Sequence, residues 1–182
     1  SGDELAELIE PFDATRYNTN ATVAENLLFG TPVDEAFAED SLAANEYLLE
    51  VLEKVGLTGD LLEIGRQVAE TMVELFSGLP PGHEFFEQFS FISSDDLPDF
   101  QAILGRANQG GLDQLSPEDR HRLLALPFKV ILARHRLGVI DEEMQGRILE
   151  ARSVFAAGLP EDQNGAIAFF DSERYNDAAS IQ

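Results

Sequence analysis

Basic side chains recur at a fixed spacing in the second half of the chain, and they are the first candidates for chemistry. The run Arg120-His121-Arg122-Leu123 returns fourteen residues later as Arg134-His135-Arg136-Leu137. On one continuous helix this spacing is close to four turns, which would place both runs near one face. Such a docking patch could hold a phosphate, a carboxylate-rich helix or lipid headgroups, although charges of this kind more often form a solvated face. The candidate patch consists of Arg120, Arg122, Arg134 and Arg136.

The other titratable residues lack the spacing of a catalytic or metal site. His83, His121 and His135 do not form a His-Glu-x-x-His pair, and the chain has no cysteine. The acidic pairs 95–96 and 142–143 fall at expected helix starts, where carboxylates interact favourably with the helix dipole. No Gly-x-Ser-x-Gly elbow and no twelve-residue calcium loop is present. We therefore expect no catalytic residue, metal or cofactor in this chain.

A short sequence element occurs twice, once near each end of the chain. Residues 12–23 align without a gap with residues 170–181, sharing Phe, Asp, Arg, Tyr, Asn and Ala. The separation of 158 residues is far longer than the roughly 20 to 50 residues of a solenoid repeat. An Arg, a Tyr and an Asn kept together at both ends predict a contact with a further domain, with the guanidinium groups paired to carboxylates and the phenol rings packed. These residues are Arg16, Tyr17 and Asn18, and Arg174, Tyr175 and Asn176.

The first copy continues into Thr22-Val23-Ala24-Glu25-Asn26-Leu27-Leu28-Phe29-Gly30. This run resembles the segment that follows the glutamine-bearing loop of ATP-binding-cassette transporter ATPases. The resemblance covers about 19 residues at the start of the chain and 12 at its end. In that family the segment opens the helical subdomain beside the coupling helices of the membrane domain, which implies that Glu25 and Asn26 contact the host domain or take part in coupling.

The chain also departs from that family. Ala14 stands where the family has its glutamine, and the phosphate-binding Gly-rich loop and the Leu-Ser-Gly-Gly-Gln signature are missing. The resemblance therefore implies an insertion that does not hydrolyse ATP, with ATP and Mg²⁺ held elsewhere in a parent protein. We expect a boundary segment at 1–30, a helical insertion domain at 31–165 and the second copy of the boundary element at 166–182.

Such an insertion would regulate or couple ATP-driven transport from the cytoplasmic side of a bacterial inner membrane. Its expected partners are the rest of the ATPase domain, the transporter membrane domain and a cytosolic regulatory protein. The alternative hypothesis is a free-standing acidic helical module for protein–protein interaction. A net charge of −22 argues against nucleic acid or anionic lipid as the main partner. No apolar run reaches the roughly 18 residues of a membrane span, so we expect no direct membrane insertion.

Hydrophobic periodicity predicts an all-α fold, an irregular bundle of five to seven helices with short extended segments at the two ends. At 182 residues and 44% hydrophobic content the chain is long enough to bury a core. Pro127 predicts a kink or break near Leu126, with a helical continuation over 128–137. A Phe-rich piece at 85–91 is expected to join the core. The expected helices are 22–30, 41–56, 58–78, 94–108, 116–126, 128–137 and 141–158, and the expected strand is 166–170.

Overall fold

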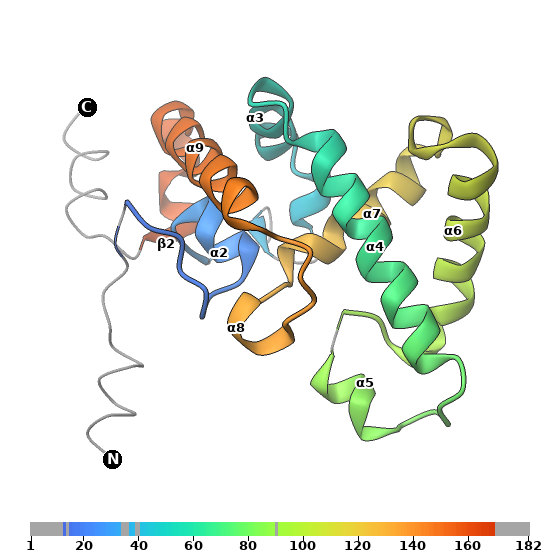
Figure 1. The fold of residues 1–182 in the computed structure, drawn as a ribbon. Helices are drawn as coiled ribbons and strands as arrows, with labels where there is room; N and C mark the ends of the chain where they lie inside the picture. Colours follow the sequence, from blue (N-terminus) through green and yellow to red (C-terminus); the bar gives the residue numbers. More distant parts are fainter. Residues whose placement is uncertain (1–12, 14, 34–36, 39–40, 90, 170–182) are drawn as a thin grey trace, which may run out of the picture.

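The computed structural model of the chain describes residues 13, 15–33, 37–38, 41–89 and 91–169. Of these residues, 68% are helical and 5% lie in strands, which confirms the predicted all-α class. The described part holds eight α-helices, of which two span only four or five residues (Figure 1). The α-helices are α2 (Val23–Leu28), α3 (Glu46–Lys54), α4 (Thr58–Phe76), α5 (Glu84–Gln88), α6 (Leu97–Gly110), α7 (Pro117–Phe128), α8 (Leu132–His135) and α9 (Glu142–Gly158).

Short 3₁₀ turns and two strands complete the described elements. The turns are η2 (Leu42–Ala44), η3 (Ser94–Asp96), η4 (Leu112–Gln114) and η5 (Glu161–Ala166), and the strands are β1 (Gly30–Pro32) and β2 (Ile167–Phe169). The expected strand at 166–170 is therefore confirmed within the described residues. Its partner was not expected, because three residues after a helix have too little pattern to be recognised as a strand.

Side-chain caps start several helices where the sequence predicts them. The Thr22 hydroxyl accepts from the Glu25 N–H at 3.0 Å, while the Glu25 carboxylate accepts from the Thr22 N–H at 3.1 Å, completing the expected capping box. Ser116 and Asp141 cap α7 and α9 in the same way, by accepting from the backbone three residues on. The helix expected from Ser41 begins later, at Glu46, because Asn45 supplies the cap.

The segment after Pro127 differs from the prediction. Helix α7 runs through Pro127, which lies in its last turn, and ends at Phe128, two residues beyond the expected end at Leu126. The expected helix over 128–137 is wrong in extent, because Phe128 ends α7 and, of the residues after it, only Leu132–His135 is helical. Residues 130 and 131 pair instead with α2: the Val23 N–H donates to the Val130 carbonyl at 3.0 Å, and Thr22 forms a bridge with Ile131.

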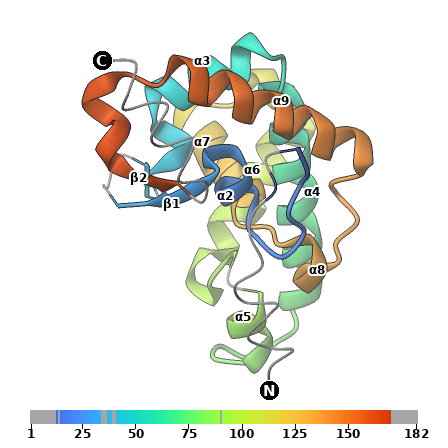
Figure 2. The same ribbon diagram turned by 90° about the vertical axis from the view of Figure 1, so that its left-hand side faces the viewer.

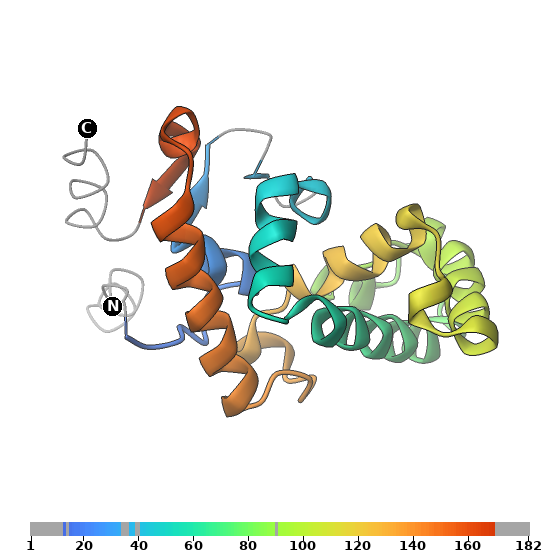
Figure 3. The same ribbon diagram turned by 90° about the horizontal axis from the view of Figure 1, so that it is seen from above.

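The helices divide between two regions that share one hydrophobic core (Figure 3). The junction region, residues 15–33 and 130–169, packs α2 against α9 beside the sheet. The helical lobe, residues 58–89 and 91–128, packs α4 against α7 and α6. Helix α3 lies between the two regions and contacts both α9 and α4. Residues 15–30 thus belong to the same folded body as the expected insertion domain.

Two glycines allow close approach of backbones, one in each region. A methyl group at Gly65 would lie 2.1 Å from the Leu123 carbonyl oxygen, where α4 crosses α7. A methyl group at Gly30 would lie 2.5 Å from the Ala168 carbonyl oxygen, where β1 meets β2. The lobe and the junction therefore each depend on one residue without a side chain.

The sheet is a single antiparallel pair at the edge of the junction region (Figure 2). Its register places Gly30 opposite Phe169, Thr31 opposite Ala168 and Pro32 opposite Ile167. The Val33 N–H adds a hydrogen bond of 2.8 Å to the Ala166 carbonyl. This pairing brings the two ends of the helical interior together.

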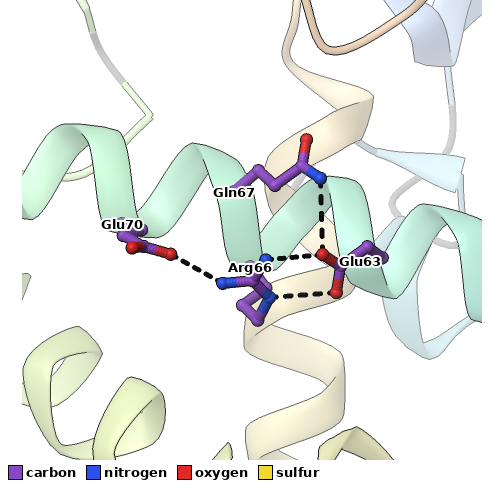
Figure 4. A network of polar contacts seen from close by, with 4 residues as sticks. All are labelled: Glu63, Arg66, Gln67 and Glu70. Atoms are coloured by element: carbon purple, nitrogen blue, oxygen red, sulfur yellow. Dashed lines mark hydrogen bonds and ion pairs between the residues drawn. The ribbon is translucent and has the colours of Figure 1, made fainter. Parts of the chain in front are cut away.

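Ion pairs lie on the solvent-facing side of the lobe. On α4, Arg66 lies between Glu63 and Glu70 at 2.5 and 2.6 Å, and Gln67 donates to Glu63 (Figure 4). Pairs at these helical spacings stabilise a helix by only a few tenths of a kcal/mol, roughly 0.3–0.5 each. They favour the helical state of α4 but do not determine what it packs against.

Candidate functional site

One of the predicted contact residues, Asn26, is a buried asparagine in the junction region, and another, Asn18, bonds to it. Asn26 is fully buried in α2. Its side-chain oxygen accepts from the Asn18 N–H at 2.9 Å, and its Nδ2 donates to the carbonyls of Asn18 and Thr22, each at 2.9 Å. One amide thus holds the 18–22 loop against the helix that follows it. A side chain used in this way is not available to contact another domain directly.

Arg152 of α9 completes this polar cluster from the far side of the core. Its side chain is 1% exposed, its Nε donates to the Asn26 carbonyl at 2.7 Å, and its Nη2 donates to the Asn26 side-chain oxygen at 3.0 Å. The guanidinium carbon also lies 4.5 Å from the centre of the Phe29 ring, a cation–π contact. Phe29 ends α2 with a φ of 51°. Arg152 therefore holds both the last turn of α2 and the residue that terminates it.

Tyr17 lies at the edge of the same cluster. Its hydroxyl is buried and has no hydrogen-bond partner in the part of the chain that the structure describes. Burial raises the pKa of the Tyr17 phenol, and the positive charge of Arg152 acts in the opposite direction. The phenol is therefore neutral across the physiological range and can still donate its proton to an acceptor.

The remaining residues of the predicted contact set are placed as follows. Arg16 is exposed, whereas Glu25 is half-buried and is used in the capping box with Thr22. Of the first copy, Arg16 is thus the charged side chain best placed to reach another surface. The second-copy residues Arg174, Tyr175 and Asn176 lie outside the residues that the structure describes.

The four arginines of the candidate docking patch do not share one continuous helix. Arg120 and Arg122 lie on α7, whereas Arg134 and Arg136 lie on and just after the short α8. Arg122 is paired with Asp99 at 3.1 Å and Asp96 at 3.5 Å and stacks on Phe100, so its charge is balanced within the lobe. Arg134 and Arg136 are exposed. The break after Pro127 removes the four-turn geometry on which the patch was predicted.

The histidines are separated by the same break. His135 is 8% exposed, and its Nδ1 accepts from the Ile131 N–H at 2.9 Å. Its ring centre lies 4.4 Å from that of Phe91 in an edge-to-face contact. Desolvation, with a smaller contribution from the charge of Arg134, lowers the pKa of His135. His135 is therefore a neutral core histidine that ties α8 to the Phe-rich piece.

Sequence reasoning missed Arg152, although a signal for it was present. Ile148, Ala151 and Phe155 form the buried stripe of α9, and Arg152 falls on that stripe at helical spacing. A charged residue among apolar positions of a helix requires a buried partner, since an isolated buried charge is strongly unfavourable. The sequence could have pointed to a buried polar site on α9, but not to Asn26 as the residue it meets.

Among the residues that the structure describes, no three His, Cys, Asp or Glu side chains converge as metal ligands would. No helix in this part of the chain is both long and apolar enough to span a bilayer.

Comparison with known proteins identifies no relative. No protein-family model, no curated protein and no solved structure matches this chain. The functional argument therefore depends on the residues and contacts described above.

Proposed function

We propose that this chain is a regulatory or coupling insertion within the nucleotide-binding domain of an ATP-binding-cassette transporter and does not hydrolyse ATP by itself. The pairing of Gly30 with Phe169 carries the proposal. Gly30 ends the segment that resembles the transporter ATPases, and Phe169 directly precedes the second copy of the repeated element. The helical interior therefore leaves and returns at one place, as an insertion into a host domain must.

The contacts of α2 supply a means of coupling. Arg152 binds the last turn of α2 from α9, and β1 follows α2 directly. A displacement of α9 would therefore be transmitted to the boundary segment through buried, charge-assisted hydrogen bonds and not through a flexible linker. Movement of packed helices of this kind is a common basis for switching between two states of a domain.

In this proposal ATP and Mg²⁺ bind elsewhere in the parent protein. The partners of the chain are the rest of the ATPase domain, the transporter membrane domain and a cytosolic regulatory protein, on the cytoplasmic side of the inner membrane. Arg16 is exposed in the first copy and is the residue that we expect to meet a carboxylate of the host domain.

The first test uses the parent gene. We expect a phosphate-binding Gly-rich loop upstream, and Asn-x-x-Phe-Gly followed by Leu-Ser-Gly-Gly-Gln downstream. In the parent protein, deletion of residues 31–169 should leave ATP hydrolysis measurable but change its dependence on transport substrate. Flanking sequence without either motif would overturn the proposal.

A point substitution makes the same test without deletion. Arg152→Met in the parent protein should weaken the link between α9 and α2 and thereby change substrate-stimulated ATP turnover. Arg147→Met is the matched control on the same helix, because Arg147 pairs with the partly exposed Asp60. Equal turnover in the two variants and the parent would contradict coupling through α9.

A third measurement concerns the chain alone. A ligand that binds only the folded state raises the melting temperature of a protein. Because the proposal places the nucleotide site elsewhere in the parent protein, addition of MgATP should leave the melting temperature of this chain unchanged. A clear rise at millimolar MgATP would show a nucleotide site in this chain and contradict the proposal.

The alternative function is a free-standing acidic helical module that recruits a basic protein. The net charge of −22 favours this alternative, since an acidic surface attracts partners of opposite sign. Salt-sensitive capture of one basic partner by the isolated chain, together with flanks lacking both ATPase motifs, would select it.

A further inference from the structure

A cavity of about 280 Å³, half open to solvent, lies between α3, α4 and α7, and none of its lining residues belongs to the polar cluster of the junction region. Its walls are mainly apolar, formed by Leu49 of α3, Leu62 of α4, and Pro117 and Leu124 of α7. A cavity of about 150 Å³ is enough to hold benzene. The space is therefore large enough for a small organic molecule of roughly ten non-hydrogen atoms.

The polar groups at this cavity are cations and hydrogen-bond donors. Arg120 and His121 line it from α7, and both are half-buried. In the described part of the chain the Arg120 guanidinium has no hydrogen-bond or ion-pair partner, in contrast to that of Arg122 two residues on. A half-buried guanidinium beside apolar walls has five donors to satisfy, and a carboxylate matches two of them at once.

The start of α4 also favours a negatively charged ligand. Thr58 is the first residue of α4 and lines the cavity, and its hydroxyl is buried without a hydrogen-bond partner among the described residues. No side chain caps this helix, so its first N–H groups are not satisfied in that way. The nearby Asp60 is engaged by Arg147 at 2.5 Å. The helix start thus contributes positive potential next to Arg120.

One acidic residue limits the charge of the occupant. Glu53 lines the cavity from α3 and is exposed. Its carboxylate offsets the charge of Arg120 and repels any anion in the cavity, so a ligand with two negative charges is disfavoured more than one with a single charge. The lining therefore favours one negative charge and an apolar body over a phosphate or a dicarboxylate.

We propose that this cavity binds a small monocarboxylate with an apolar body of about six carbons. The carboxylate of this ligand pairs with Arg120. The side chains of His121 and Thr58 supply further hydrogen bonds, and the hydrocarbon packs against Leu49, Leu62 and Leu124. The inference stands apart from the insertion hypothesis, since it concerns a face formed by α3, α4 and α7 alone. Within a transporter such a site would let a metabolite bias the packing of the lobe on α3.

The test uses hexanoate as the probe and hexan-1-ol as the neutral molecule of the same length. Titration calorimetry and amide chemical shifts of the labelled chain should show hexanoate binding at least about tenfold more tightly than hexan-1-ol, since hydrogen bonds to charged groups are the strong ones. The shifted amides should belong to α3, the start of α4 and α7. Equal affinity for the two molecules, or no binding by either, would overturn the proposal.

Three variants locate the site. Arg120→Gln should lower hexanoate affinity about tenfold and leave hexan-1-ol unchanged, whereas Arg134→Gln, at an exposed position elsewhere, should change neither. Thr58→Val removes the buried hydroxyl while keeping the shape, so it should weaken hexanoate binding severalfold and raise the melting temperature of the free chain. If Thr58→Val raises the melting temperature but leaves hexanoate affinity unchanged, Thr58 does not contact the ligand. Unchanged hexanoate affinity in Arg120→Gln, with the fold verified by circular dichroism, would overturn the proposal.

Discussion

The junction region and the helical lobe are held together in different ways. In the junction, the contacts join residues far apart in the chain, such as Arg152 with Asn26 across 126 residues, and several are polar and fully buried. In the lobe, α4, α6 and α7 lie within about 70 residues of one another and share the apolar core. Their ion pairs are partly exposed: Arg66 pairs within α4, whereas Arg106–Asp119 and Arg122–Asp99 join α6 to α7. The comparison shows that orientation in the junction depends on specific partners, whereas the lobe depends on shape and burial.

The difference has an energetic consequence. Exposed ion pairs contribute little, roughly 0–1 kcal/mol each, because water already solvates both charges. A buried guanidinium with satisfied hydrogen bonds has a different character, since removing one partner leaves the other without a donor in a site that water does not reach. The junction should therefore be sensitive to single polar substitutions that the lobe tolerates.

The largest expected effect comes from Arg152→Met. The substitution keeps the length of the side chain but leaves the Asn26 carbonyl and side-chain oxygen without their donors from α9. We expect the free energy of unfolding in urea to fall by about 3 kcal/mol. Arg147→Met, on the same helix, should cost less than about 1 kcal/mol. Equal losses in both variants would contradict the distinction between the buried Arg152 and the half-buried Arg147.

The next effect distinguishes the two regions by their glycines. Gly65→Ala places a methyl group 2.1 Å from the Leu123 carbonyl oxygen, so α4 and α7 must separate. We expect a loss of about 2 kcal/mol in the free energy of unfolding. Gly105→Ala in α6 is the control, because nothing lies within 4 Å of the added methyl group, and it should gain about 0.5–1 kcal/mol.

The location of the damage sharpens this comparison. Gly30→Ala, which displaces β2 from β1, should increase amide hydrogen exchange in α2, β1 and β2 while leaving the lobe protected. Gly65→Ala should do the reverse. Uniform loss of protection in both variants would show that the two regions unfold as a single unit.

A smaller loss of stability is expected from substitutions at the helix caps of the two regions. Thr22→Ala removes a capping box at the start of α2, and we expect a loss of about 1–2 kcal/mol in thermal or urea unfolding. Ser116→Ala removes a single exposed capping bond at the start of α7 and should cost about 0.5–1 kcal/mol. A larger loss for Ser116→Ala would show that the lobe, and not the junction, depends on its local caps.

The smallest effect concerns pH and the His135 side chain that links α8 to the lobe. Its pKa is lowered in the folded state from a usual value of 6.5, so the unfolded chain binds the proton more readily. The contribution of the neutral ring is complete above about pH 6.5 and is lost as the pH falls through that value toward the lower folded-state pKa. Stability should therefore rise with pH in this window.

The control for the pH dependence is His135→Asn, in which the amide oxygen can still accept from the Ile131 N–H. The difference in unfolding free energy between wild type and variant should grow from pH 5 to pH 7, measured by urea denaturation at each pH. The subtraction removes the contribution of the many carboxylates that titrate in both proteins. A constant difference would show that His135 does not titrate in this window.

Helix starts were predictable because their chemistry is local. Ser116 and Asp141 bond to N–H groups three residues away, so their effect does not depend on the rest of the fold. The end of α7 after Pro127 was predictable for the same reason. The helical character of 129–131 was predicted wrongly, because Val130 pairs with Val23 across the junction, and no local pattern records that partner.

The candidate site was predictable only in part. The sequence singled out Asn26 and the Arg-Tyr-Asn element by their repetition and resemblance, but assigned them to an outer contact. The structure buries Asn26 against Arg152, which lies in a helix whose pattern gave no reason to connect it with α2. The cavity between α3, α4 and α7 likewise depends on how three helices meet.

The sequence by itself determined the all-α class, the capped starts of α2, α7 and α9, and the break at Pro127, because each depends on hydrogen bonds or steric contacts within a few residues. The tertiary structure alone decided that β1 pairs with β2, that Arg152 meets Asn26, and that Arg120 lines a cavity while Arg122 is paired. The first two outcomes join segments more than 100 residues apart, and the third depends on how α3, α4, α6 and α7 meet. In each case the shared core of the molecule decides which surfaces come together.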